Sequence, residues 1–244
     1  VFVFYPADDE ELDDTNQVTS ISSTVAFPDE FAALVPDFFI QELPVDYYTD
    51  APASDAGPFP VVLHSHGASG FPLYSANHLS HTASWGHVVA APSHPTRNLA
   101  AAVGGGASTE ASDVDDLAAT LDRLEVENGD ADSLLFDTMD TSLVGAEGHS
   151  AGGRAVLQWS LADDRVQALI GLAPAPPVRL DLLVPDEAED GGDGDEADTD
   201  GAEGAPADDE DRAARTAEAL AELEPPTVPT LLMPGERDGV IPLE

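Results

Sequence analysis

A serine flanked by small residues is the part of this sequence best suited to chemistry. Ser150 lies in the pentapeptide Gly148-His149-Ser150-Ala151-Gly152, after an apolar run and before apolar residues with helical spacing. A sharp strand-to-helix turn would lift the serine hydroxyl above the sheet, and small neighbours let the backbone turn that tightly. The helix N-terminus that follows favours a developing negative charge. We therefore expect Ser150 to be a nucleophile, with Gly148, His149 and Gly152 supporting the turn.

An earlier loop offers the hydrogen-bond donors that an attack by this serine requires. The apolar run Val61–Leu63 leads into residues 64–68 (HSHGA), where Gly67 lets the backbone turn inward. An oxyanion hole needs two N–H groups aimed at one point, one directly after the nucleophile and one from such a loop. We expect these donors to be the backbone N–H groups of Ala151 and Ala68.

The same loop contains a histidine pair that could be mistaken for a metal site. His64 and His66 alternate as in an H-x-H pair, but no further Asp/His cluster follows at useful spacing, and the chain has no Cys. We expect both histidines to orient the loop by hydrogen bonds. The sequence thus predicts no metal and no organic cofactor.

A carboxylate near the end of the sequence could complete the machinery. The apolar run Thr230–Met233 is followed by a loop that contains Glu236 and Asp238. In an open α/β sheet, active sites assemble in loops beyond the C-terminal ends of the strands. Asp238 would fix the tautomer of a histidine and stabilise the imidazolium form, and Glu236 is the nearby alternative.

Strands and helices that alternate along the chain would position these loops. Such alternation predicts an α/β fold with a mostly parallel sheet and helices on both faces. Residues 7–57 are expected to be loops around short elements near 38–40 and 45–48, and Ser112 is expected to be a helix N-cap. The expected strands span 1–5, 61–63, 87–91, 142–145, 166–172 and 230–233, and the expected helices span 74–85, 112–126, 150–161 and 213–223.

Charge is the unusual property of the composition. Lys and Arg together number 8, Asp and Glu 48, and the formal net charge is −40. Such a field repels nucleic acid and anionic membrane surfaces, so neither is an expected partner. The acidity fits either a protein kept soluble in high salt or a biased genomic composition. The nearly uninterrupted acidic and glycine-rich stretch at about 185–212 is expected to be a disordered insertion.

Location and assembly stay open at this stage. The sequence has no apolar run long enough to span a bilayer and no signal-peptide pattern. It begins at Val1 rather than Met, so a signal peptide could have been removed from an exported protein. A cytoplasmic protein of a high-salt organism fits equally well, and the oligomeric state cannot be predicted.

Five segments that occur in a fixed order resemble a known group of enzymes. They read YP, PVVLHSHG, WGHVVAAPSHP, GHSAGG and PTLLMPGERDGVIP. Together they resemble the branch of the α/β-hydrolase superfamily that contains platelet-activating-factor acetylhydrolases, chlorophyllases, dienelactone hydrolases and polyester (cutinase-like) hydrolases. The resemblance implies an α/β-hydrolase fold in a single domain over residues 1–244. It also implies a serine ester hydrolase that acts on a small-molecule or polymeric ester through an acyl-enzyme.

Two details of the resemblance concern the catalytic set. Ser150 stands where dienelactone hydrolases have a Cys, and the acid after the later strand resembles the cutinase arrangement. The superfamily order is nucleophile, acid, histidine, yet no histidine follows Ser150. We therefore expect the catalytic histidine, the last strand and the closing helix to lie beyond Glu244, in a longer parent protein. His149, expected to point into the fold, and His94 are not expected to replace that histidine.

Two other functions remain open from the sequence. Prolyl-peptidase relatives also use a G-x-S-x-G-G turn, so a serine peptidase of the same fold is one alternative. A non-catalytic protein of this fold, which lacks the histidine, is the other.

Overall fold

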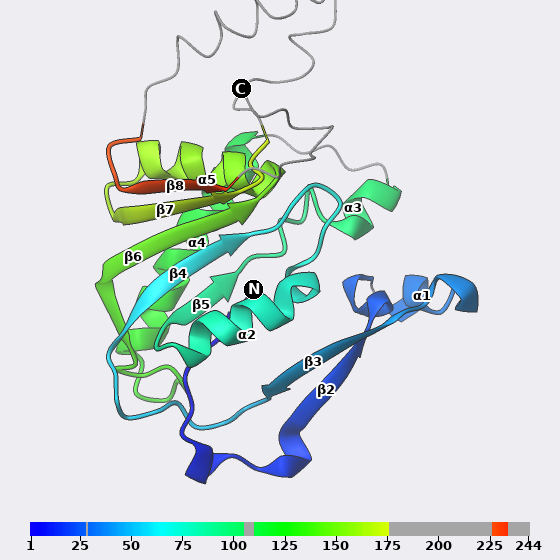
Figure 1. The fold of residues 1–244 in the computed structure, drawn as a ribbon, viewed down its shortest axis with the longest axis horizontal. Helices are drawn as coiled ribbons and strands as arrows, with labels where there is room; N and C mark the ends of the chain where they lie inside the picture. Colours follow the sequence, from blue (N-terminus) through cyan, green and yellow to red (C-terminus); the bar gives the residue numbers. More distant parts are fainter. Residues whose placement is uncertain (28, 105–109, 176–225, 234–244) are drawn as a thin grey trace, which may run out of the picture. The chain divides into compact units, whose positions relative to one another are not determined.

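Six strands form one sheet in the order β1-β5-β4-β6-β7-β8 (Figure 1). The computed structural model describes residues 1–27, 29–104, 110–175 and 226–233. Strand β1 pairs with β5 in antiparallel orientation, and the other four pairings of this sheet are parallel. The strands are β1 (Phe2–Phe4), β4 (Phe59–Ser65), β5 (Val88–Ala91), β6 (Met139–His149), β7 (Val166–Leu172) and β8 (Thr230–Met233).

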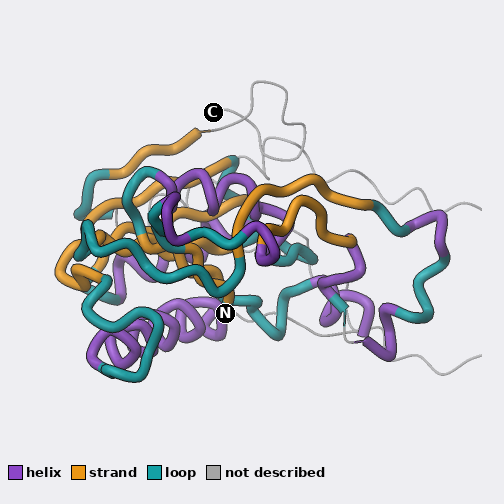
Figure 2. Tube along the Cα trace, turned by 90° about the horizontal axis from the view of Figure 1, so that it is seen from below, coloured by secondary structure: helices purple, strands orange, loops and turns teal. Residues whose placement is uncertain are grey.

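Helices cover both faces of this sheet, because successive strand residues point to opposite sides. On one face, Val61 and Leu63 of β4 pack in one cluster with residues of α4 (Glu110–Gly129) and α5 (Ala151–Ala162). On the other face, Val62 and the odd-numbered residues of β5 pack against Leu79 and Ala83 of α2 (Ala76–Ser84). Figures 1 and 2 show helices on either side of the strands. This arrangement confirms the predicted fold class.

The chain order of the strands reverses at β4, since β5 lies on one side of it and β6 on the other. In open α/β sheets, ligands bind beyond the carboxyl ends of the strands at such a switch point. The loop after β4 and the turn after β6 therefore meet where the topology favours a site.

A separate pair of antiparallel strands lies outside the main sheet, namely β2 (Gln17–Ser22) and β3 (Glu42–Tyr48). Ile21 and Val45 are buried in a cluster with Phe71 and Leu73. The sequence indicated elements near 38–40 and 45–48 but missed β2. The shorter helices are η1 (Asp9–Glu11), η2 (Asp14–Asn16), η3 (Ser23–Ala26), α1 (Asp29–Ala32), η4 (Asp37–Phe39), η5 (Pro72–Ser75) and α3 (Leu99–Gly104).

Several predicted boundaries differ from the structure, and two of them change how an element is read. Helix α4 begins at Glu110 rather than after Ser112, so the prediction that Ser112 is its N-cap is wrong. Strand β6 begins at Met139, three residues before the expected start, because it continues its pairing with the beginning of β4. The acidic stretch at 185–212 and the expected helix at 213–223 lie outside the described residues. In the described ranges, no helix is both long and apolar enough to cross a membrane.

Candidate active site

Ser150 occupies a strained turn between β6 and α5. Its backbone has φ 54° and ψ −119°, in a region that residues with a side chain rarely adopt and that is often found at functional sites. Its N–H donates to the carbonyl oxygen of Leu172 at 3.0 Å, and its own carbonyl oxygen accepts from the N–H of Ala175 at 2.8 Å. These two hydrogen bonds hold the turn to the end of β7 and the residues that follow it.

Close backbone approaches explain the glycines on either side of the serine. A Cβ atom on Gly148 would lie 2.2 Å from the carbonyl oxygen of Gly152, and one on Gly152 would lie 2.0 Å from the carbonyl oxygen of Ser65. Both distances are far below any real contact of a Cβ atom. The pentapeptide therefore needs glycine at both positions, since the backbones of β6, α5 and β4 touch there.

The loop after β4 lies directly against the serine. A Cβ atom on Gly67 would be 3.4 Å from Cβ of Ser150 and 3.0 Å from Nδ1 of His149. Among the described residues, no group accepts a hydrogen bond from the backbone N–H of Ala68 or Ala151, whereas the N–H of Ser150 is occupied. Their role as oxyanion donors stays a prediction.

His149 differs from its expected orientation. The residue is exposed rather than directed into the fold. It is the last residue of β6, at the end of the strand, and its ring lies beside Gly67. The prediction that it points inward is wrong.

A buried arginine, which the sequence did not single out, holds the loop after β4. The guanidinium of Arg97 donates to the carbonyl oxygen of His66 and, at 2.9 Å, to Oγ of Ser65. The carbonyl oxygen of Arg97 accepts from the N–H of Ser69 at 3.0 Å. Its Nε lies 2.9 Å from Oδ2 of Asp113 in helix α4, and both side chains are 3% exposed. Arg97 therefore links the loop that carries Ala68 to α4.

His94 lies in the same buried network and is not directed at Ser150. Its Nε2 is 2.9 Å from Oγ of Ser65, and its Nδ1 is 3.0 Å from Oδ2 of Asp116. Burial, with a smaller effect of the Arg97 charge, lowers the pKa of His94 to about 2. The ring is therefore neutral, so Nδ1–H donates to Asp116 and Nε2 accepts from the Ser65 hydroxyl. Ser65, His94 and Asp116 thus form a Ser-His-Asp set in which Ser65 and His94 are buried and Asp116 is partly exposed. This set holds the loop after β4 rather than activating Ser150.

Comparison with known protein families assigns this chain to one of them. The sequence profile described as "Platelet-activating factor acetylhydrolase, isoform II" matches residues 1–128. The chain belongs to this family. The matched part of this acetylhydrolase-family protein includes the Gly67 loop and His94 and ends before Ser150.

The other comparisons add less. A solved ferulic acid esterase from Streptomyces cinnamoneus is similar, with 24% identity and a TM-score of 0.41. The match covers 51% of this chain and 39% of that one, so the chain spans about two-fifths of that protein. No curated protein matches the chain.

The two histidines of the H-x-H pair have different roles in this acetylhydrolase-family protein. His66 lies 2.8 Å from the carbonyl oxygen of Gly67 through Nδ1, and 2.9 Å from that of Ser93 through Nε2. It orients the loop as expected. His64 instead lies with Nδ1 2.9 Å from Oε1 of Glu147, on the strand beside it. The expected loop-orienting role therefore holds for His66 and not for His64.

Glu147 also forms a hydrogen bond with a second histidine, His78 of α2. Nε2 of His78 is 2.9 Å from both carboxylate oxygens. Burial alone would raise the pKa of Glu147, but the hydrogen bonds from His64 and His78 outweigh it and lower the pKa to about 2. The same bond to Glu147 raises the pKa of His78. Glu147 is therefore a carboxylate at neutral pH.

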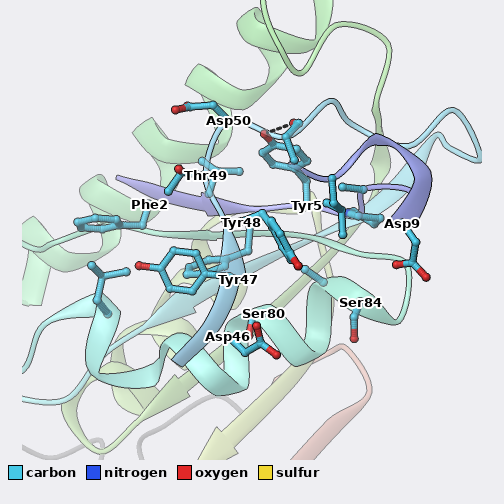
Figure 3. Close-up of a pocket in the computed structure, with 18 residues that line it drawn as sticks. Phe2, Tyr5, Asp9, Asp46, Tyr47, Tyr48, Thr49, Asp50, Ser80 and Ser84 are labelled. Carbon is cyan, nitrogen blue, oxygen red and sulfur yellow. Dashed lines mark hydrogen bonds between the residues drawn. The ribbon is translucent and has the colours of Figure 1, made fainter. Parts of the chain in front are cut away.

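The remaining expected residues and one cavity complete the description. Asp238 and Glu236 lie outside the described residues. A cavity of about 530 Å³ lies among β1, β3 and α2, and Figure 3 shows Tyr5, Tyr47 and Tyr48 around it. Its lining contains none of the expected catalytic or oxyanion residues, so it does not identify where a substrate reaches Ser150.

Proposed function

We propose that this protein is a carboxylic-ester hydrolase in which Ser150 is the nucleophile. The main support is the strained backbone conformation of Ser150, together with the close approach of the loop at Gly67 to its side chain. Membership of the acetylhydrolase family supports ester hydrolysis as the reaction class.

In the proposed reaction, Oγ of Ser150 bonds to the acyl carbon while the ester C–O bond breaks. The alcohol leaves with a proton, and water then cleaves the acyl-enzyme to release the acid. The N–H groups of Ala68 and Ala151 would hold the negative oxygen, assisted by the N-terminus of the 12-residue helix α5. Arg97 would keep Ala68 in place, because it binds the loop on both sides of that residue.

The acid of the proposed mechanism, Asp238, rests on the sequence pattern, and the base is a histidine from outside residues 1–244. Asp238 would orient a histidine that follows it, as in the superfamily order. The substrate would be a small or apolar ester, in solution or in a polymer, since a protein of net charge −40 repels anions.

A non-catalytic protein of the same fold is the second candidate, and one observation favours it. All seven histidines fall within the described ranges, and none of them forms a hydrogen bond with Oγ of Ser150. Without a general base, such a serine would retain only the residual catalysis that the oxyanion donors and substrate binding supply.

Hydrolysis of p-nitrophenyl butyrate by the full-length protein, including the histidine that the mechanism requires, separates the two candidates. We expect turnover above the buffer rate, loss of that turnover in Ser150→Ala, and no change in Ser84→Ala. Ser84 is a matched control because it is exposed on α2 and its hydroxyl donates only to the local carbonyl of His81. Parent turnover at the buffer rate would support the non-catalytic candidate. Unchanged turnover in Ser150→Ala would exclude Ser150 as the nucleophile.

A further inference from the structure

Three side chains from three different elements converge near the end of β6, the strand that leads to Ser150. They are His64 of β4, Glu147 of β6 and His78 of α2, and each offers a metal-ligand atom within 4.8 Å of the others. Nδ1 of His64 and Nε2 of His78 both lie 2.9 Å from Oε1 of Glu147. Residues 64 and 147 are direct neighbours in the parallel register of the sheet. Two imidazoles and one carboxylate thus face a single point.

The three side chains differ in burial, which would give an ion both a shielded site and access from solvent. The side chain of His64 is 1% exposed and that of Glu147 is 6% exposed, whereas that of His78 is 46% exposed. Two ligands are therefore withdrawn from water, and the third stands at an opening to solvent. An ion would have a path to the site without unfolding of the sheet.

The far nitrogen of His64 makes the exchange of a proton for an ion feasible. Nε2 of His64 is buried and has no hydrogen-bond partner among the described residues. To bind an ion, Nδ1 must give up its proton, which can then reside on Nε2. Only the bond to Glu147 is lost in this step. His94 differs, because Ser65 and Asp116 already engage both of its ring nitrogens.

We propose that His64, His78 and Glu147 form a binding site for a divalent transition-metal ion of the Zn²⁺ type. Two His nitrogens and one carboxylate oxygen are a common ligand set for zinc, with solvent in the fourth position. With Zn–N distances of about 2.0–2.1 Å, ligand atoms of a tetrahedral site lie about 3.3 Å apart. Both 2.9 Å spacings need to widen by about 0.4 Å. Rotation of the half-exposed His78 supplies this at one contact, and rotation of the Glu147 carboxylate supplies it at the other. The hard ions Mg²⁺ and Ca²⁺ prefer sites made of oxygen ligands.

A second cluster of possible ligands does not meet the same conditions. His94, Asp113 and Asp116 also bring ligand atoms within 4.8 Å of one another. The Arg97 guanidinium, however, lies 2.9 Å from Asp113 and already supplies a positive charge there. We therefore assign the ion to the cluster around Glu147, where it would tie α2 to β4 and β6 three residues before Ser150.

Calorimetric titration of the metal-free chain with ZnCl₂, in excess MgCl₂ to occupy weak sites on the acidic surface, tests this assignment. We expect one zinc ion per chain. We also expect His78→Ala and Glu147→Gln to weaken its binding by about tenfold or more. His81→Ala is the matched control, since His81 is an exposed histidine on the same helix and should leave binding unchanged.

A second readout keeps the test independent of folding. Circular dichroism checks each variant, and His78→Ala decides the matter if Glu147→Gln fails to fold, because His78 is half-exposed. Bound Co²⁺ should give the visible absorption of a tetrahedral site in the parent and in His81→Ala only. Absence of zinc binding, or equal binding by His78→Ala and the parent, would overturn the proposal, as would equal loss in His81→Ala.

Discussion

Replacement of Asp113 by alanine would leave the guanidinium of Arg97 buried without its nearest carboxylate. Nε of Arg97 lies 2.9 Å from Oδ2 of Asp113, and both side chains are only 3% exposed. Water cannot easily replace the lost charge at such burial. Removal of one partner from a buried pair costs about 3–5 kcal/mol. Domains of this kind are stable by about 5–15 kcal/mol, so the change is a large part of the total.

Urea unfolding followed by tryptophan fluorescence measures this cost, because Trp159 is fully buried in the core. We expect Asp113→Ala to lose about 3–5 kcal/mol in free energy of unfolding. Asp115→Ala, an exposed neighbour on α4, should change it by less than about 0.5 kcal/mol. Exchange of both partners, as Arg97→Met with Asp113→Leu, should recover part of the loss, since no buried charge then remains unpaired. The rest stays lost with the hydrogen bonds of Arg97 to His66 and Ser65.

The opposite result would be informative. If Asp113→Ala stayed within about 1 kcal/mol of the parent, the guanidinium would have found another partner or water. The claim that this pair anchors the loop of Ala68 would then fail. If the loss is seen, esterase turnover should fall with it, because the guanidinium also binds the carbonyl oxygen of His66 beside that loop.

Two further predictions test the turn and the pH dependence. Gly152→Ala should destabilise the protein by more than about 3 kcal/mol in urea unfolding, because its Cβ would lie 2.0 Å from the carbonyl oxygen of Ser65. Gly129→Ala, whose Cβ meets nothing within 4 Å, is the control, and equal effects of the two would contradict the close approach. Hydrogen bonds from Arg165 lower the pKa of Asp163, so its contribution is present above the unfolded pKa of about 3.9 and is lost as the pH falls through the folded pKa. The stability difference between the parent and Asp163→Asn, up to about 1 kcal/mol, should therefore shrink on acidification from about pH 6 to below about pH 4. A difference that stays constant would contradict it.

Local patterns in the sequence were enough to predict most of the sheet. β7 and β8 have the predicted bounds because each is a mostly apolar run that ends in turn-forming residues. The alternation of strands and helices gave the parallel sheet with helices on both faces. Strand β2 was missed because only Ile21 and Val18 of its six residues face apolar neighbours, which leaves a weak alternating pattern.

Partners distant in the sequence could not be predicted in this way. His64 and Glu147 are 83 positions apart and meet only because β4 and β6 pair in one register. Arg97 and Asp113 belong to a loop and a helix that no local spacing connects. Both histidines of the H-x-H pair were expected to orient the loop, whereas the fold brings Glu147 to His64 and His78 to Glu147. Prediction of such contacts needs the strand order and register, which the periodicity of single segments does not contain.

Intact-mass spectrometry after treatment with a fluorophosphonate tests the central claim about Ser150 most directly, because the reagent bonds to activated serines. We predict one phosphonyl group on the full-length parent protein, which includes the histidine that activates the serine, located in the tryptic segment 124–154. The adduct should also form on Ser84→Ala and be absent from Ser150→Ala. A parent chain that takes up no label, or a Ser150→Ala chain labelled as fully as the parent, would contradict Ser150 as the nucleophile of this fold.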